Sequence, residues 1–250
     1  MTLTSIDHDR HSWPCIDFWV AWGGNGWESL RHMVQKLPFT HEGTDGDIRR
    51  LRVLLGEVFS ECGLRFSERL AVLNLACGRA DETGALAAAV APATIGFYLG
   101  MDLRADAVAE ARKRWELPGG EIDFREGNAA MIGRMKGLPG FDMVFIRHQN
   151  YWHEPMVWEG IMEESLAALK EGGHLVCTSY FDLEHELLVA SMRARGAKIS
   201  ANVRHTLSRE LPVTAGKSVD RWVAVFGKNR VLPARLQAGA ELNQADPGTF

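Results

Sequence analysis

The sequence predicts an α/β fold in which helices cover both faces of a doubly wound, mostly parallel sheet. Between Leu70 and Lys228, short apolar runs alternate with stretches whose apolar residues have helical spacing. Such alternation is typical of parallel strands joined by right-handed helical crossovers. A turn of small residues also follows the first run, and an acidic residue ends the second. In such sheets ligands bind at the carboxyl ends of the strands, so we expect the functional residues there.

The region before Leu70 is predicted to be helical. Residues 47–62 have apolar side chains at i, i+3 and i+4 spacings, which indicates an amphipathic helix. A second helix is predicted over residues 27–37 and is ended by Pro38. We expect a helical cap at residues 1–64, a core at 65–228 and a mobile C-terminal tail at 229–250.

Within the core, predicted strands and helices follow one another in order. The strands are runs rich in Val, Ile, Leu and Phe, at residues 70–76, 94–101, 121–126, 141–147, 172–180, 198–207 and 221–228. The helices alternate with these strands and are predicted at residues 82–91, 105–116, 129–136, 156–170 and 183–195.

Composition narrows the classes of function. Hydrophobic residues make up 46% and charged residues 24% of the chain, which is ordinary for a globular protein. The net charge of −4 argues against a nucleic-acid-binding face. No apolar run reaches the roughly 20 residues that span a membrane, and residues 1–10 lack the apolar segment of a signal peptide. The Cys residues are scattered, as reduced thiols would be, so we expect a cytoplasmic protein.

Residues 71–82 are the most informative stretch. A strand-length apolar run ends at Ala76 and breaks at Gly78, and an Ala-rich stretch that suits a helix follows. Small side chains let the backbone approach a ligand, and the N–H groups at the start of a helix face it. Asp102 ends the next predicted strand roughly 20 residues later, where an acidic residue meets the hydroxyls of a ribose in nucleotide-binding units.

Three segments around this turn resemble the first three motifs of the class I S-adenosylmethionine-dependent methyltransferases, namely Leu73–Ala80, Gly100–Ala111 and Phe124–Ala129. Leu169–Val176 resembles the entry to the fifth strand of that family. The motifs occur in the family's order, and the resemblance covers about residues 65–228. It implies a Rossmann-like, seven-stranded sheet whose last strand is antiparallel. It also implies S-adenosylmethionine as cofactor and S-adenosylhomocysteine as product.

The resemblance further implies cofactor-binding roles for residues at the strand ends. Asp102 would accept hydrogen bonds from the ribose hydroxyls, and Asn128 would accept one from the adenine amino group. The implied set is Asn74, Ala76, Cys77, Gly78, Arg79, Asp102, Leu103, Asn128, Ala129 and Arg147.

The chain also departs from the family's motifs. The family usually has an acidic residue at position 74, Gly at positions 76 and 80, and Asp at position 128. Because Ala disfavours positive φ, the turn is expected to take a slightly different path. A Rossmann-like protein that has lost its cofactor is the alternative.

Polar and aromatic residues cluster after the fourth and fifth core strands. Residues 147–155 include two His, a Tyr and a Trp, at the place where family members hold the donated methyl group and the acceptor. His148 is a candidate general base because the pKa of His lies near neutrality; a helix-capping or backbone-bonding role is the alternative. Tyr180 and His185 follow the fifth strand and are further catalytic candidates. Trp152 is a candidate for stacking on the substrate or on adenine, and a place in the core is the alternative.

Absent motifs narrow the acceptor. Methyltransferases that act on the amino groups of adenine and glutamine share an Asn/Asp-Pro-Pro-Tyr motif after the fourth strand, and residues 147–150 do not match it. Cytosine-5 methyltransferases have a Cys after a Thr at the fifth strand, whereas Cys177 precedes Thr178 here. The His and Glu residues at 148, 153 and 154 match no strong metal-binding spacing, so no metal is predicted. We predict methyl transfer to an O, N or S atom of a small molecule by a monomer or homodimer. An RNA or protein methyltransferase and a non-catalytic S-adenosylmethionine-binding protein are the alternatives.

The N-terminal segment is crowded with Trp13, Trp19, Trp22 and Trp27. Class I relatives often build substrate specificity from N-terminal additions, so we expect Trp19, Trp22 and Trp27 to cover the acceptor site near His148 or Trp152. A helix packed on the core is the alternative.

Overall fold

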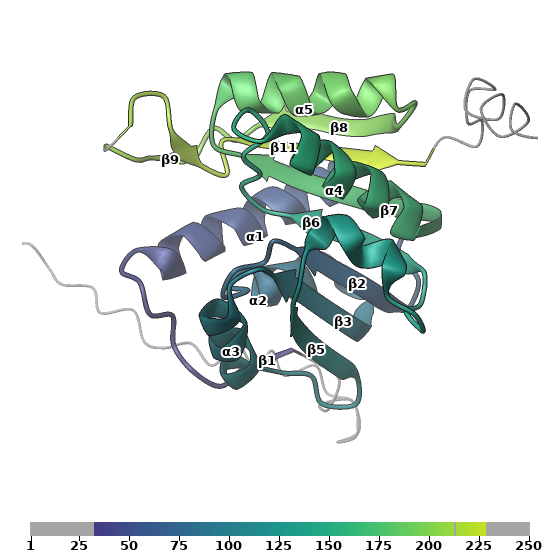
Figure 1. Ribbon diagram of the computed structural model, residues 1–250. Coiled ribbons are helices and arrows are strands. Elements are labelled where there is room, and N and C mark those ends of the chain that lie inside the picture. The colour runs from purple at the N-terminus through teal and green to yellow at the C-terminus, as the bar shows by residue number, and fades with distance from the viewer. Residues whose placement is uncertain (1–32, 213, 229–250) are drawn as a thin grey trace, which may run out of the picture.

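The computed structural model describes residues 33–212 and 214–228, which fold around a seven-stranded sheet. Across this sheet the strands stand in the order β5–β3–β2–β6–β7–β11–β8 (Figure 1). Their bounds are β2 Arg69–Leu75, β3 Thr94–Asp102, β5 Glu121–Glu126, β6 Phe141–Ile146, β7 Leu169–Ser179, β8 Lys198–Arg204 and β11 Trp222–Gly227. Each strand lies where an apolar run predicts one, so the Rossmann-like α/β fold is confirmed.

The strand directions place several chain segments at one edge of the sheet. The pairs from β5 to β7 are parallel, whereas β11 is antiparallel to both β7 and β8. The carboxyl ends of the parallel strands therefore lie beside the start of β11, and we call this the carboxyl edge. A hairpin of β9 (Arg209–Glu210) and β10 (Ser218–Val219) precedes β11 and projects from the left side of Figure 1.

Helices cover both faces of the sheet, as Figure 1 shows. Successive side chains of a strand point to opposite faces, so Val72 lies in the core on one face and Leu73 in the core on the other. The first core includes α1 (Thr44–Glu61), α2 (Thr83–Ala89) and α3 (Ala105–Arg114), and the second includes α4 (Pro155–Ala168), α5 (Asp182–Ala194) and the 3₁₀ helix η2 (Ala129–Arg134). None of the helices within residues 33–212 and 214–228 is long and apolar enough to span a membrane.

Helix α1 carries the predicted amphipathic pattern. Its buried apolar side chains are Leu51, Leu54, Leu55, Val58 and Phe59. They belong to the same hydrophobic core as the buried side chains of α2, so α1 and α2 cover the same face of the sheet. The helix begins at Thr44, slightly before the predicted start at residue 47.

The predicted helix over residues 27–37 is wrong in the part that the structure describes. Val34 and Gln35 form strand β1 (Val34–Gln35), which pairs antiparallel with β4 (Trp115–Glu116). Pairing with a segment distant in sequence thus overrides the local helical pattern, and β4 also shortens the helix predicted over residues 105–116. Trp19, Trp22, Trp27 and the predicted tail at 229–250 lie outside the described residues, so their predicted roles stay predictions.

Candidate functional site

The turn after β2 holds alternate residues in the left-handed region. The φ angles are 52° at Ala76, 55° at Gly78 and 53° at Ala80. Both alanines therefore adopt the conformation that glycine adopts most readily. Cys77 lies between them, and burial raises the pKa of its thiol well above its ordinary value. The residue therefore keeps its proton and supports the turn.

Asp102 joins the end of β3 to this turn. Its Oδ2 accepts a hydrogen bond from the Gly78 N–H at 2.6 Å. Its Oδ1 accepts from the N–H of Arg104 at 3.0 Å and from Nε of Arg104 at 3.1 Å. The structure thus brings Gly78 and Asp102, which belong to separate sequence motifs, into direct contact.

The surroundings of Gly78 fit a nucleoside. A Cβ atom at Gly78 would lie 2.7 Å from Nη2 of Arg104, so a side chain there would displace the guanidinium. Leu103 follows Asp102 and is 70% exposed, and an apolar side chain beside a carboxylate suits a planar base beside a ribose. A small-residue turn, a carboxylate and an exposed apolar side chain are thus available for S-adenosylmethionine.

A buried polar network lies next to this turn. Nδ2 of Asn74 donates to Oε1 of Glu82 at 2.5 Å and to the Tyr98 hydroxyl at 2.8 Å. Burial raises the pKa of Glu82 to about 7, although the nearby Arg147 guanidinium acts in the opposite direction. Nη1 of Arg147 lies 3.9 Å from Oε2 of Glu82. Asn74 is fully buried, so it supports the site from within the core.

Three other predicted cofactor residues have protein contacts of their own. Oδ1 of Asn128 accepts from the Ala130 N–H at 3.0 Å and caps η2, and the neighbouring Ala129 is buried. These two residues follow β5 and lie at the carboxyl edge. Arg79 instead directs its guanidinium to α3, with Nε 3.8 Å from Oε2 of Glu110.

Arg147, at the end of β6, forms a buried ion pair with Asp220, which precedes β11. Nε and Nη2 of Arg147 donate to the two carboxylate oxygens at 3.0 and 2.6 Å, and the Thr178 hydroxyl donates to Oδ1 at 2.9 Å. Although burial acts to raise it, the charge of Arg147 and the hydrogen bonds from His148 and Arg147 hold the pKa of Asp220 well below its usual range. Since a buried charge is tolerated when it is paired and hydrogen-bonded, Asp220 is a fixed anion at the carboxyl edge.

His148 is bound to the same carboxylate. Its Nε2 lies 2.8 Å from Oδ1 of Asp220, and the backbone N–H of Asp220 points to the same Nε2 with an N···N distance of 3.2 Å. These two partners compete: the backbone N–H favours a lone pair on Nε2, whereas the carboxylate favours a proton there, because two lone pairs at 2.8 Å would repel each other. The charged carboxylate is the shorter and stronger partner, so it favours the tautomer whose lone pair is on Nδ1. Burial lowers the pKa of His148, and the Asp220 carboxylate acts against this shift. A neutral imidazole with a basic Nδ1 results.

Tyr180 packs directly against this imidazole. The two ring centroids are 3.8 Å apart and the rings are stacked. Burial raises the pKa of Tyr180 to about 12, so its hydroxyl keeps the proton near neutral pH and can donate a hydrogen bond. The structure therefore brings together two of the three predicted catalytic residues, His148 and Tyr180.

The structure does not bring His185 into contact with them. Nδ1 of His185 is 3.1 Å from Oγ of Ser179, and Nε2 is 2.6 Å from Oδ1 of Asn202. The ring also stacks on Trp222, with centroids 4.8 Å apart. Both ring nitrogens are thus used within a buried part of the fold, and these contacts favour a structural role.

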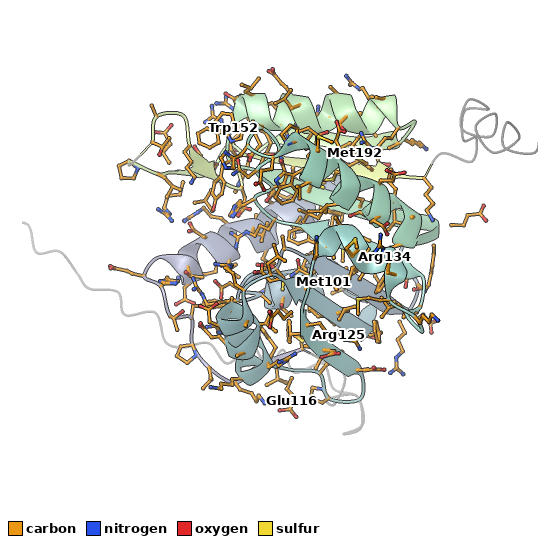
Figure 2. The ribbon with its side chains drawn as sticks, viewed as in Figure 1. Met101, Glu116, Arg125, Arg134, Trp152 and Met192 are labelled. Carbon is orange, nitrogen blue, oxygen red and sulfur yellow. The ribbon has the colours of Figure 1, made fainter. Side chains whose placement is uncertain are left out.

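Aromatic side chains extend from His148 and Tyr180 toward the surface. Trp152 is 43% exposed, and its ring centroid lies 4.6 Å from that of Phe181. Figure 2 shows Trp152 at the side of the molecule from which the β9 hairpin projects. Nζ of Lys217, on that hairpin, lies 4.3 Å from the centroid of Tyr180 and 6.0 Å from that of Phe181.

Backbone strain is concentrated at the carboxyl edge. In the described residues, the non-glycine residues with positive φ are Ala76, Ala80, His148 and Asp220. Such conformations cost free energy and collect at functional sites. They mark the turn after β2 and the His148–Asp220 pair as one strained region.

Sequence reasoning missed Glu82, Asp220 and Lys217. Asp220 stands immediately before a predicted strand, but only the antiparallel direction of that strand places it at the carboxyl edge. Glu82 begins the helix predicted over residues 82–91, and a carboxylate beside a small-residue turn is the signal that could have identified it. The described residues contain no group of three or more His, Cys, Asp or Glu side chains that could hold a metal ion.

Comparisons with known proteins agree with this geometry. Residues 72–173 match the family model described as a methyltransferase domain. No curated protein matches the sequence significantly.

Several solved structures have a similar fold. The N-methyltransferase NodS from Bradyrhizobium japonicum WM9 superposes with a TM-score of 0.53 at 16% identity, over 74% of this chain and 97% of that chain. An S-adenosylmethionine-dependent methyltransferase from Clostridium acetobutylicum ATCC 824 gives a TM-score of 0.52 at 12% identity, over 72% and 91% of the two chains. At such identities the likeness concerns the fold alone.

Proposed function

We propose that the chain is a class I methyltransferase that transfers the methyl group of S-adenosylmethionine to an O, N or S atom of a small molecule; the methyltransferase-domain match over residues 72–173 and the fold support this proposal. The observation that carries this proposal is the junction of Gly78 and Asp102 at the carboxyl edge. A turn with small side chains and a strand-end carboxylate are the two elements that such a nucleoside requires. Bound there, S-adenosylmethionine would supply an electrophilic methyl group on a sulfonium sulfur.

The chain's own residues would hold and orient the cofactor. Asp102 would accept hydrogen bonds from the ribose hydroxyls, and Leu103 would contact the adenine ring. Arg104, whose Nε now donates to Asp102, would move away from the carboxylate. Its side chain is largely exposed and its ion pair with Asp102 is correspondingly weak, so this movement costs little.

His148 would act on the acceptor. If the nucleophilic atom carries a proton, Nδ1 of His148 accepts it as the new bond to carbon forms, and the imidazolium is stabilised by Asp220. Tyr180 would donate a hydrogen bond to the acceptor or hold the imidazole in place by stacking on it. Alignment of the nucleophile with the methyl group would supply most of the rate enhancement.

The charges of the carboxyl edge support a small acceptor. Guanidinium groups there are paired with carboxylates, namely Arg147 with Asp220, Arg209 with Asp47 and Arg221 with Asp182. Binding of a nucleic acid needs cations that are free to neutralise phosphates. These paired charges therefore favour a small molecule over an RNA.

The test is calorimetric binding of S-adenosylhomocysteine to the Asp102→Ala variant. The loss of charge-assisted hydrogen bonds to the ribose should weaken binding by roughly 2–3 kcal/mol, or about 30- to 150-fold. Asp106→Ala is the matched control, because Asp106 lies exposed in the first turn of α3. Equal affinities in the two variants would contradict the assignment of Asp102. An absence of binding to the unaltered protein would contradict the proposed function.

A further inference from the structure

Four rings form a continuous surface at the carboxyl edge. His148 stacks on Tyr180, the centroids of Tyr180 and Phe181 are 6.5 Å apart, and Phe181 contacts Trp152. This aromatic row runs from the proposed general base to an exposed indole. The exposed indole of Trp152, at the outer end of this row, is a surface on which a planar ligand can stack.

The ammonium group of Lys217 lies over this row without a carboxylate partner. Within residues 33–212 and 214–228, no Asp or Glu oxygen lies within 4.0 Å of its Nζ atom. Burial raises the pKa of Glu184, although the charge of Lys217 acts to lower it. The carboxyl group of Glu184 is buried, however, and already accepts hydrogen bonds from the backbone N–H groups of Tyr180 and Phe181. The ammonium group of Lys217 thus lies against the faces of the two rings.

Lys217 also adjoins a space of ligand size. Residues 210–212 and 214–217 line a pocket of about 310 Å³ on the β9–β10 hairpin. Ligand sites begin at about this volume. Lys217 belongs to the lining of this pocket, and its ammonium group also lies over the ring of Tyr180.

The position of Lys217 distinguishes between charges on the ligand. Faces of aromatic rings attract cations, but here the ammonium group of the protein already covers the rings of Tyr180 and Phe181. A cationic ligand would have to displace Lys217, whereas an anionic group would pair with it. Neutral aromatic ligands would gain the stacking alone.

We propose that the methyl acceptor is an aromatic molecule with an anionic group, stacked on the exposed ring of Trp152 and paired through that group with Lys217. This inference rests on the proposed function, since it assigns the acceptor side of the same site. The reacting O–H, N–H or S–H group of the molecule lies toward His148. Nδ1 would take the proton of that group as its O, N or S atom bonds to the methyl carbon; the carbon–sulfur bond of S-adenosylmethionine would break, and S-adenosylhomocysteine would leave.

The experiment measures binding of three matched probes to the full chain saturated with S-adenosylhomocysteine. The probes are 4-hydroxybenzoate, neutral 4-hydroxybenzyl alcohol and cationic tyramine, followed by saturation-transfer NMR or calorimetry. We expect 4-hydroxybenzoate to bind about tenfold more tightly than the alcohol, and tyramine to bind most weakly. Lys217→Gln should remove the preference for the anion, and Trp152→Ala should weaken the two stronger probes by similar factors.

Lys136→Gln is the control, because it removes the same charge at an exposed position after η2, away from the carboxyl edge. Tighter binding of tyramine, an unchanged preference in Lys217→Gln, or binding of S-adenosylhomocysteine without any of the probes would overturn the acceptor assignment. S-adenosylhomocysteine binding is measured separately in each variant. A failure of that binding in the unaltered protein counts against the proposed function instead.

Discussion

Asp220 is the residue on which the polar side chains of the acceptor region converge. Its carboxylate accepts from Arg147 and Thr178 and lies within hydrogen-bond reach of His148. A positively charged Arg147 alone would disfavour protonation of His148. Asp220 cancels that charge and selects the imidazole tautomer. We therefore expect Asp220 to position His148 and set its basicity without touching the acceptor.

This role predicts a change in the titration of His148 in Asp220→Asn. The carboxylate acts to raise the pKa of His148, so its removal should lower that pKa further. The amide oxygen of asparagine can still accept a hydrogen bond from Arg147, but it carries no charge to hold a proton on Nε2 of His148. The measurement is the pH dependence of the imidazole ¹⁵N shifts, which report both the pKa and the tautomer.

Asp182→Asn serves as the control for that titration. It removes a carboxylate from the same edge, but Asp182 contacts Arg221 and Trp222 and does not reach His148. Unchanged ¹⁵N shifts for His148 in Asp220→Asn would show that Asp220 serves only the fold. Retained near-UV circular dichroism would establish that the variant is folded.

At the scale of elements, an ion pair joins the β9–β10 hairpin to helix α1. Oδ1 and Oδ2 of Asp47, in α1, accept from Nε and Nη2 of Arg209, in β9, at 2.8 and 2.6 Å. Burial acts to raise the pKa of Asp47, but hydrogen bonds from Arg209 and Arg50 hold it below its usual range. Because the hairpin carries Lys217, α1 contributes indirectly to the acceptor region.

Loss of the ion pair between Arg209 and Asp47 should make the hairpin open more often. Arg209→Gln should speed amide hydrogen exchange at Leu211 and Ser218, whose N–H groups donate to the carbonyls of Lys217 and Tyr180. The effect should be at most about fivefold, because Arg209 is partly exposed and such pairs contribute about 1 kcal/mol or less.

Arg50→Gln is the matched control for the exchange experiment. Arg50 also pairs with Asp47, but it lies three residues away on the same helix and has no hydrogen bond to the hairpin. It should leave exchange in the hairpin nearly unchanged. Equal acceleration in both variants would indicate that α1 as a whole, and not the bridge, stabilises the hairpin.

For the whole molecule, local patterns predicted the sheet well because each strand is defined by its own apolar run. The strand ends carried Gly78, Asp102 and His148, so much of the candidate site followed from the strand boundaries. The start of β11 is different: Asp220 reaches Arg147 only through tertiary pairing of an antiparallel strand. Likewise β1 forms because β4 offers backbone groups, which no local pattern in residues 27–37 reveals.

Buried carboxyl groups give the whole molecule a second property, a stability that depends on pH. Burial raises the pKa of both Glu82 and Glu184 to about 7 from an ordinary value of 4.5. Between these values the folded state retains protons that the unfolded chain releases. Stability should therefore fall as the pH rises from about 4.5 to about 7, by up to about 3 kcal/mol for each group.

Glu82→Gln should remove the share of this dependence that belongs to Glu82. The amide oxygen can still accept from Nδ2 of Asn74, but it carries no charge at any pH. In urea unfolding, the variant should match the unaltered protein near pH 4.5 and be more stable at pH 8 by about 1–2 kcal/mol. Glu186→Gln, at an exposed position of α5, should leave the pH profile as it was. If Glu82→Gln were instead less stable at pH 8, then Glu82 would be an ionised partner of Arg147, and the interaction across 3.9 Å would outweigh the burial of its charge.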